Sequence, residues 1–211
     1  MNNYHVIERI DINHEKHLLE ILLDKAHLSS IHYSEYIDYI AANDKLLQFD
    51  KWNDDQHSIK VAFIFQRSNQ QSENEILSNN QMSSEMENFL NLISERIELK
   101  DFHHYRGDLD TKSNLHGIYS YFTKYENHQI MFNVSPMISS DENDHKYIQR
   151  KSLIANALVC IVFQEKGSQA YQPNLILGKV TQVYIVVQPV DYHGGFFYQV
   201  RFGIQLTNKC R

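Results

Sequence analysis

Two near-continuous apolar runs, Leu158–Phe163 and Val183–Val187, constrain the fold of this sequence more than any other feature. A strand with one face in water alternates apolar and polar residues, whereas a run without alternation is typical of a strand covered on both faces. A third run, Ile59–Phe65, is rich in β-branched and aromatic residues and also predicts a buried strand. Because a doubly covered sheet needs helices on its faces, we expect an α/β fold with a central mixed β-sheet flanked by helices.

Helical periodicity is clearest after residues 84–87, Ser-Glu-Met-Glu, which have the order of a capping box. Apolar residues then recur at the spacing of one helix face, at Met86, Phe89, Leu90 and Ile93. This pattern predicts a helix. Between it and the first strand, residues 67–80 are rich in Ser, Asn, Gln and Glu and predict a loop.

Further runs predict strands in the second half of the chain. Ile118–Thr123 and Gln129–Val134 are aromatic and β-branched, and the five residues Lys124–His128 between them suit the loop of a hairpin. Phe196–Leu206 follows the turn at 193–195 and alternates in part between apolar and polar residues. We expect this last run to be an outer strand.

The N-terminal part of the chain has a different pattern. Between Glu15 and Leu28 apolar residues recur at helical spacing, and a second helical stretch begins near Ser34. The polar segment Asp50–His57 ends this region. We therefore predict a helical N-terminal segment over residues 1–57 and an α/β domain over residues 58–211.

Composition and charge exclude several classes of protein. Of the 211 residues, 42% are apolar, which is enough to form a core, and 20 basic against 26 acidic side chains give a net charge of −6. Such a chain has no general positive field that attracts nucleic acid, and its two cysteines, Cys160 and Cys210, do not suggest a disulfide framework. No apolar stretch has the length of a signal-peptide core or a membrane span. We expect a cytoplasmic protein without a transmembrane segment and without a nucleic-acid partner.

The common catalytic signatures are absent from the sequence. It has no glycine-rich phosphate loop, no Cys-x-x-Cys, no His-Glu-x-x-His and no Gly-x-Ser-x-Gly. Among 12 histidines, the pair His103 and His104 lacks a second cluster that would complete a zinc site. We expect no metal site and no bound cofactor.

Several segments nevertheless occur in the order found in Rap GAP domains. Residues 105–112, Tyr-Arg-Gly-Asp-Leu-Asp-Thr-Lys, resemble the Tyr-Arg-Gly-Gly-Leu-Asp-Thr-Lys loop of that family, and residues 150–158 resemble its Arg-Lys-Arg-His-Ile-Gly-Asn-Asp-Ile segment. Other matching segments are the opening strand at 59–67, the helix at 83–99, the hairpin at 117–135 and the strand at 183–189. The resemblance covers about residues 60–205. Such domains usually continue with a further strand and helix, so the chain looks C-terminally truncated.

The resemblance implies a GTPase-activating protein. Proteins of this family stimulate GTP hydrolysis by a small GTPase of the Rap, Rheb or Ral kind and insert an asparagine carboxamide into its active site. By position that asparagine is Asn156. A carboxamide offers an acceptor and two donors on one rigid plane, so it can orient the attacking water without titrating. Arg150 and Lys151 match basic residues of the family and are expected to contact the GTPase, while GTP and magnesium would belong to that partner.

Departures from the family pattern leave alternatives open. Ser152 and Leu153 stand where the family has Arg-His, and Ala155, Ala157 and Asp108 replace a glycine, an aspartate and a glycine. One alternative is a catalytically weak or inactive module of the same fold that binds a GTPase. A second is that Asn156 only satisfies backbone groups at a helix edge or at the start of a strand. A third is a homo-oligomer formed through the N-terminal helical segment.

Overall fold

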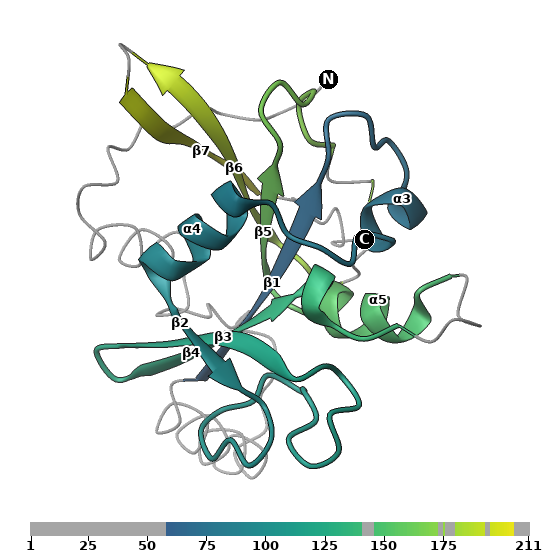
Figure 1. Ribbon diagram of the computed structural model, residues 1–211, viewed down its shortest axis with the longest axis vertical. Helices are drawn as coiled ribbons and strands as arrows, with labels where there is room; N and C mark the ends of the chain where they lie inside the picture. The colour runs from purple at the N-terminus through teal and green to yellow at the C-terminus, as the bar shows by residue number, and fades with distance from the viewer. Residues whose placement is uncertain (1–57, 141–145, 173–174, 176–179, 193–194, 205–211) are drawn as a thin grey trace, which may run out of the picture.

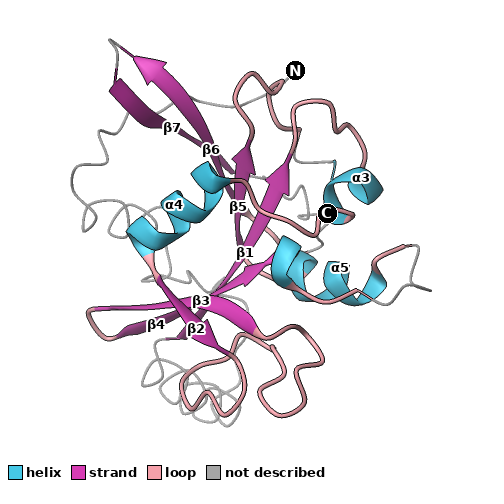
Figure 2. Cartoon of the chain, in the orientation of Figure 1, coloured by secondary structure: helices cyan, strands magenta, loops and turns pink. Residues whose placement is uncertain are grey.

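The computed structural model describes residues 58–140, 146–172, 175, 180–192 and 195–204. Within these ranges, seven strands form one sheet in the order β2-β3-β4-β1-β5-β6-β7. The inner pairs β4/β1, β1/β5 and β5/β6 are parallel, and the outer pairs are antiparallel. Helices lie against this mixed sheet (Figures 1 and 2), so the predicted fold class is confirmed.

The predicted strands at 59–65, 158–163 and 183–187 are inner strands of the sheet. In chain order the elements are β1 (Ser58–Gln66), α3 (Glu73–Leu77), α4 (Ser84–Ile93), β2 (Glu95–Glu98), β3 (Tyr119–Tyr125), β4 (His128–Val134), η1 (Ser135–Met137), α5 (Ile148–Ala155), β5 (Val159–Gln164), β6 (Val183–Tyr192) and β7 (Gly195–Ile204). All six residues of β5 are buried. The lack of alternation between apolar and polar residues in this run therefore correctly indicated a strand that is covered on both faces.

Each face of the sheet carries its own apolar core. On one face α4 packs against Phe63, Phe132 and Phe163. On the other face α3 and α5 pack against Ala62 and Ile64 (Figure 1). Successive residues of a strand point to opposite faces, so Lys60, two residues before Ala62, belongs to the face that α5 covers.

Helix α4 confirms the helix predicted near residue 84, with two corrections. Its N-cap is Ser83 and not Ser84, because the Ser83 hydroxyl accepts a hydrogen bond from the Met86 N–H at 3.2 Å. The helix also ends at Ile93, whereas the family resemblance extended it to residue 99. The residues after Ile93 include the edge strand β2, which pairs with β3.

Helix α3 lies within residues 67–80, where the composition predicted a loop. Ser72 and Glu75 cap it reciprocally: the Ser72 hydroxyl accepts from the Glu75 N–H at 3.4 Å, and the Glu75 carboxylate accepts from the Ser72 N–H at 2.9 Å. The helix also buries Ile76 and Leu77 against the sheet. The loop prediction was wrong because a polar composition concealed a capping box followed by two apolar residues.

The predicted hairpin is formed by β3 and β4, with a shorter connection than expected. Tyr125 pairs with His128, which leaves only Glu126 and Asn127 as the turn in place of a five-residue loop. Glu126 adopts a φ of 49°. At the opposite edge of the sheet, β7 pairs only with β6 among the described strands, as expected of an outer strand.

The predicted N-terminal helices and the polar boundary at residues 50–57 lie outside the described residues. In the part of the chain that the structure does describe, no helix has the length and apolar character needed to cross a bilayer. The longest of these helices, α4, has 10 residues.

The reactivity of Cys160 tests whether β5 is buried. Its side chain is 3% exposed, and burial raises the pKa of the Cys160 thiol to about 12. Because the thiolate is the reactive form, Cys160 in native protein should react with a thiol reagent at least about 100-fold more slowly than in denatured protein. Mass spectrometry of the peptide that contains Cys160 measures this ratio. Equal rates in the native and denatured states would contradict the burial of β5.

Candidate functional site

Asn156 lies at the junction between α5 and β5. It is the C-cap of α5, with φ of −104° and ψ of 16°, and it is exposed. Ile154 and Ala157 on either side of it are each 1% exposed. These buried neighbours fix the backbone of the junction, while Asn156 itself remains accessible.

The Asn156 carboxamide contacts a charged pair. Lys60, near the start of the central strand β1, donates a hydrogen bond from Nζ to Asn156 Oδ1. The same ammonium forms a salt bridge with Asp108 Oδ2 at 2.5 Å. The side chain of Lys60 is 11% exposed, whereas that of Asp108 is 60% exposed. The structure therefore brings Asn156, Lys60 and Asp108 together in one group, which we call the Asn156 site.

Asp110 holds the loop that carries Asp108. Its carboxylate accepts hydrogen bonds from the N–H groups of Leu115, Ser113 and Lys112 at 3.0, 2.8 and 3.3 Å. These bonds, that from Leu115 foremost, hold the pKa of Asp110 well below its ordinary value. The carboxylate is therefore ionised near neutral pH and keeps the loop in this conformation.

Two consecutive residues of the loop have a left-handed backbone. Gly107 has a φ of 55° and Asp108 a φ of 70°. A Cβ on Gly107 would lie 2.9 Å from Met131 Cγ, so glycine is what allows the loop to approach β4. Aspartate tolerates the left-handed region better than most residues. Asp108 can thus keep the backbone conformation of a glycine while placing a carboxylate beside Lys60.

Arg150 does not lie at a surface, where the predicted GTPase contact requires it. It is 2% exposed, and its guanidinium donates hydrogen bonds to the carbonyl oxygens of Leu77, Asn79 and Ile138. The bond to Asn79 measures 2.8 Å, and those to Ile138 measure 2.6 and 3.1 Å. The prediction that Arg150 contacts a partner is therefore corrected. Its side chain joins α5 to the end of α3 and to the residue after η1, and so fixes the helix that ends at Asn156.

The other residues of α5 differ in their exposure. Lys151 is partly exposed and forms a salt bridge with Glu73 Oε2 at 2.6 Å. Ser152 is exposed, and its hydroxyl donates to the carbonyl oxygen of Gln149 at 2.8 Å. Leu153 is 6% exposed and belongs to the core beneath α5. Of the two positions where the family has Arg-His, one is therefore filled by a core residue.

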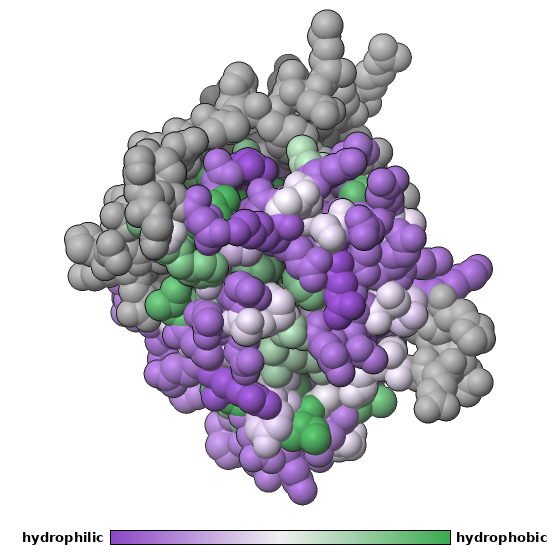
Figure 3. Space-filling model, turned by 45° about the horizontal axis from the view of Figure 1, so that its top comes forward, coloured by the Kyte–Doolittle hydropathy of each residue, from purple (hydrophilic) through white to green (hydrophobic). Residues whose placement is uncertain are grey.

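Apolar side chains lie near Asn156 at the surface. On the face shown in Figure 3 polar residues predominate and apolar residues form small groups. Leu158 and Val180 are each 42% exposed. The neighbouring residues Thr181 and Gln182 donate to the carbonyl oxygens of Ala157 and Leu158 at 2.8 and 2.9 Å, so the segment with Val180 runs beside the junction. This arrangement gives the surface around Asn156 an apolar component.

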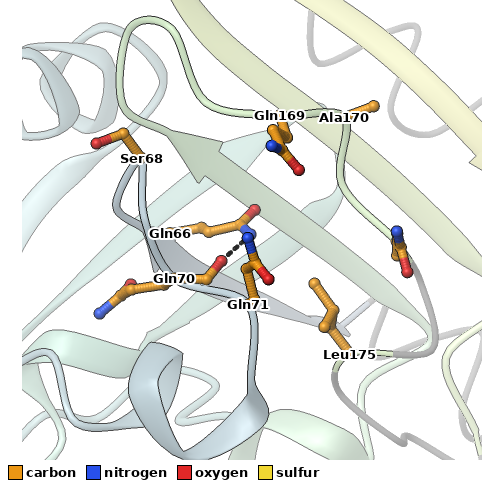
Figure 4. Close-up of a pocket in the computed structure, with 8 residues that line it drawn as sticks. Gln66, Ser68, Gln70, Gln71, Gln169, Ala170 and Leu175 are labelled. Carbon is orange, nitrogen blue, oxygen red and sulfur yellow. Dashed lines mark hydrogen bonds between the residues drawn. The ribbon is translucent and has the colours of Figure 1, made fainter.

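A cavity of about 130 Å³ lies at the carboxyl ends of β1 and β5, whereas the Asn156 site lies at their amino ends (Figure 4). Its lining residues are uncharged: Gln66, Ser68, Gln70, Gln71, Gln169, Ala170, Gln172 and Leu175. Gln66 donates to the carbonyl oxygen of Gln70 at 2.9 Å and accepts from Gln164 at 2.8 Å. Amides cannot act as general acids or bases at neutral pH. In the described ranges, no group of three His, Cys, Asp or Glu side chains could hold a metal ion either.

Comparison with known proteins identifies the family. The profile of the Rap/ran-GAP family matches residues 76–209, more than half of the chain. The chain belongs to the Rap/ran-GAP family. The resemblance stated from the sequence is therefore confirmed.

Individual relatives match similar shares of the chain. The signal-induced proliferation-associated 1-like protein 1 of Mus musculus is 37% identical over 129 residues, which are 61% of this chain and 7% of that protein. The RapA guanosine triphosphatase-activating protein B of Dictyostelium discoideum is 36% identical over 134 residues, 63% of this chain and 32% of that protein. The chain thus spans less than a third of the length of either relative. The solved structure of the TSC2 GAP domain has the same fold, with a TM-score of 0.65 and 24% identity over 71% of this chain and 82% of that chain.

Lys60 was not predicted from the sequence as part of the site. A lysine in an otherwise apolar strand, between Ile59 and Val61, was the available signal. Its meaning depends on Asp108 and Asn156, which are 48 and 96 residues away along the chain. Only the fold brings these three residues together.

The buried position of Arg150 predicts a large effect on stability. Replacing it by Met would leave the carbonyl groups of Leu77, Asn79 and Ile138 without this donor, which should lower the free energy of unfolding by roughly 3 kcal/mol or more. Lys151→Met is the matched control and should cost about 0–1 kcal/mol, because its salt bridge is partly exposed. Urea unfolding of both variants measures the difference. Equal effects would contradict the structural role of Arg150.

Proposed function

We propose that this chain stimulates GTP hydrolysis by a small GTPase of the Rap kind, with Asn156 inserted into the active site of that GTPase. The observation that carries the proposal is the position of Asn156, an exposed residue on a backbone junction fixed by buried neighbours. Membership of the Rap/ran-GAP family supports the activity, and the name of the Dictyostelium relative supports Rap as the first GTPase to test.

The carboxamide suits the chemistry of the partner's reaction. During hydrolysis a water oxygen bonds to the γ-phosphorus of GTP, the bond from that phosphorus to the bridging oxygen breaks, and GDP and phosphate leave. Asn156 Oδ1 can accept a hydrogen bond from the attacking water, while Nδ2 donates to a phosphate or protein oxygen. Because Oδ1 accepts from Lys60 in the free chain, that bond is exchanged or shared when the GTPase binds. The GTPase supplies GTP and magnesium.

Lys60 adds a cation beside the carboxamide. Its ammonium is held by Asp108, an exposed carboxylate that the anionic phosphates of GTP can displace. A positive charge already in place where negative charge develops stabilises the transition state without reorganisation. Lys60 therefore has an electrostatic role in this proposal, and Lys151, partly exposed on the same helix as the junction, is a candidate contact with the GTPase.

A second candidate function is a GTPase-binding module with little or no catalysis. Asp108 favours the binding-module function. Its carboxylate forms a salt bridge with Lys60 and places a negative charge where the GTPase would present its phosphates. The core position of Leu153 favours it as well, since an apolar side chain is buried in the core where the family has a histidine.

Asn156→Ala separates catalysis from binding. The variant should lower the stimulated rate of hydrolysis by a factor on the order of 100 or more while its affinity for the GTPase changes little, because the lost contact is made chiefly in the transition state. Asn91→Ala, which changes an exposed asparagine of α4, should leave the rate unchanged. Single-turnover phosphate release from Rap, Rheb and Ral proteins loaded with GTP measures the rates.

Two outcomes of this experiment would contradict the proposal. If the unmodified chain binds a GTPase and accelerates none, the binding-module function replaces it. If Asn156→Ala unfolds the protein, Asn156 serves the backbone at the end of α5 and not the reaction.

Asp108→Gly tests the electrostatic part of the proposal. Glycine tolerates the φ of 70° at this position, so the substitution removes the carboxylate and preserves the loop. Lys60 then becomes available to the phosphates, and kcat/KM for the GTPase should rise by roughly 3-fold to 10-fold, with a steeper dependence on salt. Asp101→Gly is the matched control, because Asp101 is also exposed and has a φ of 59°. Equal effects of the two variants would show that Asp108 does not compete for Lys60.

A further inference from the structure

Asn133 lies between the two segments that carry the Asn156 site. It belongs to the buried strand β4, is 0% exposed and pairs in register with Ala62 of β1. The apolar residues Phe132 and Val134 flank it in the sequence. A carboxamide in such a strand loses its hydration and needs hydrogen-bond partners inside the protein.

The partners of Asn133 are two backbone carbonyl groups from separate segments. Nδ2 donates to the carbonyl oxygen of Gly107 at 2.9 Å and to that of Leu153 at 3.1 Å. The Gly107 carbonyl belongs to the peptide unit that leads into Asp108. The Leu153 carbonyl is in the last turn of α5, where carbonyl groups lack partners within the helix. One amide group thus ties the loop of Asp108 to the helix that ends at Asn156.

These bonds also fix the orientation of the carboxamide. A flipped side chain would direct Oδ1 at two carbonyl oxygens, which is repulsive, so Nδ2 must face them. Oδ1 is buried and accepts no hydrogen bond from the described residues. An unsatisfied buried oxygen costs free energy, so the side chain is not optimised for stability alone.

We infer that Asn133 is a positioning residue for the proposed GTPase-activating function: its amide sets the loop of Asp108 relative to the end of α5, and so keeps Lys60, Asp108 and Asn156 in contact. This inference rests on the proposed function for its kinetic consequence. Its structural part, the coupling of residues 105–112 to residues 153–158, is independent of any activity.

Asn79 provides a matched control for the alternative that Asn133 serves stability only. It is 5% exposed, and its Nδ2 donates to the carbonyl oxygen of Phe65 at 2.7 Å and to Gln70 Oε1 at 2.8 Å. Phe65 lies near the carboxyl end of β1, whereas the Asn156 site lies near its amino end. Asn79→Asp and Asn133→Asp therefore make the same chemical change in two buried positions, one beside the carboxyl end of β1 and the other beside Ala62 in its middle.

Asn133→Asp keeps the volume of the side chain and replaces the donor by an oxygen. At about pH 8 the buried carboxylate repels both carbonyl oxygens, and kcat should fall by about 10-fold to 100-fold with KM for the GTPase changed by less than about 3-fold. Burial raises the pKa of a carboxyl group. As the pH falls to about 5.5 the neutral acid can donate one hydrogen bond again, so the rate relative to the unmodified chain should partly recover.

Asn133→Ser is a second variant that still tests the inference if Asn133→Asp does not fold. The smaller hydroxyl retains one donor at every pH, so this variant should be impaired less than Asn133→Asp at high pH and should lack its recovery at low pH. Asn79→Asp should lower thermal stability but leave kcat within about 2-fold, because its side-chain hydrogen bonds end at Phe65 and Gln70, and its backbone carbonyl, which accepts from Arg150, is kept.

Hydrogen exchange separates this inference from the proposed function. Asn133→Asp should speed exchange in both residues 105–112 and residues 153–158, and Asn79→Asp should speed it in neither. If only one of the two segments responds, or if both respond and kcat does not change in an active chain, the inference is wrong. If the unmodified chain accelerates no GTPase, the proposed function fails, and the exchange result alone decides whether Asn133 couples the two segments.

Discussion

The parallel pairing of β1 with both β4 and β5 is the constraint on which the rest of the structure depends. Parallel strands place their amino ends at the same edge of the sheet, so Lys60 of β1 and the residues before β5 meet there. The pairing thus places Lys60 beside the junction that carries Asn156, and the loop before β3 brings Asp108 to Lys60.

Buried polar residues turn this arrangement into a fixed geometry. Arg150 holds one end of α5 through carbonyl groups of two other segments, and Asn133 holds the other end together with the loop of Asp108. Neither side chain could be removed without leaving carbonyl groups unpaired in the interior. Asn156, an exposed member of the site, is therefore supported by residues that do not reach the surface.

The fold was more predictable from the sequence than the site. Apolar runs without alternation identified the inner strands, because burial on both faces leaves a local pattern. Arg150 was expected to contact the GTPase because it matches a basic residue of the family, and the Leu77 carbonyl that binds it is 73 residues away. Asn133 and Lys60 lie in apolar strands, and their hydrogen-bond partners follow from topology. The position of Asn156 came from family resemblance.

We propose that the chain recognises the transition state of GTP hydrolysis on a partner GTPase. A transition-state analogue binds a catalyst more tightly than the ground state does. Affinity should therefore be measured for one Rap protein loaded with GDP, with a non-hydrolysable GTP analogue, and with GDP plus aluminium fluoride. We expect the tightest binding, by a factor of about 100 or more, to the aluminium fluoride form, and we expect Asn156→Ala to lose that preference. Equal affinity for the analogue and the aluminium fluoride form would contradict it.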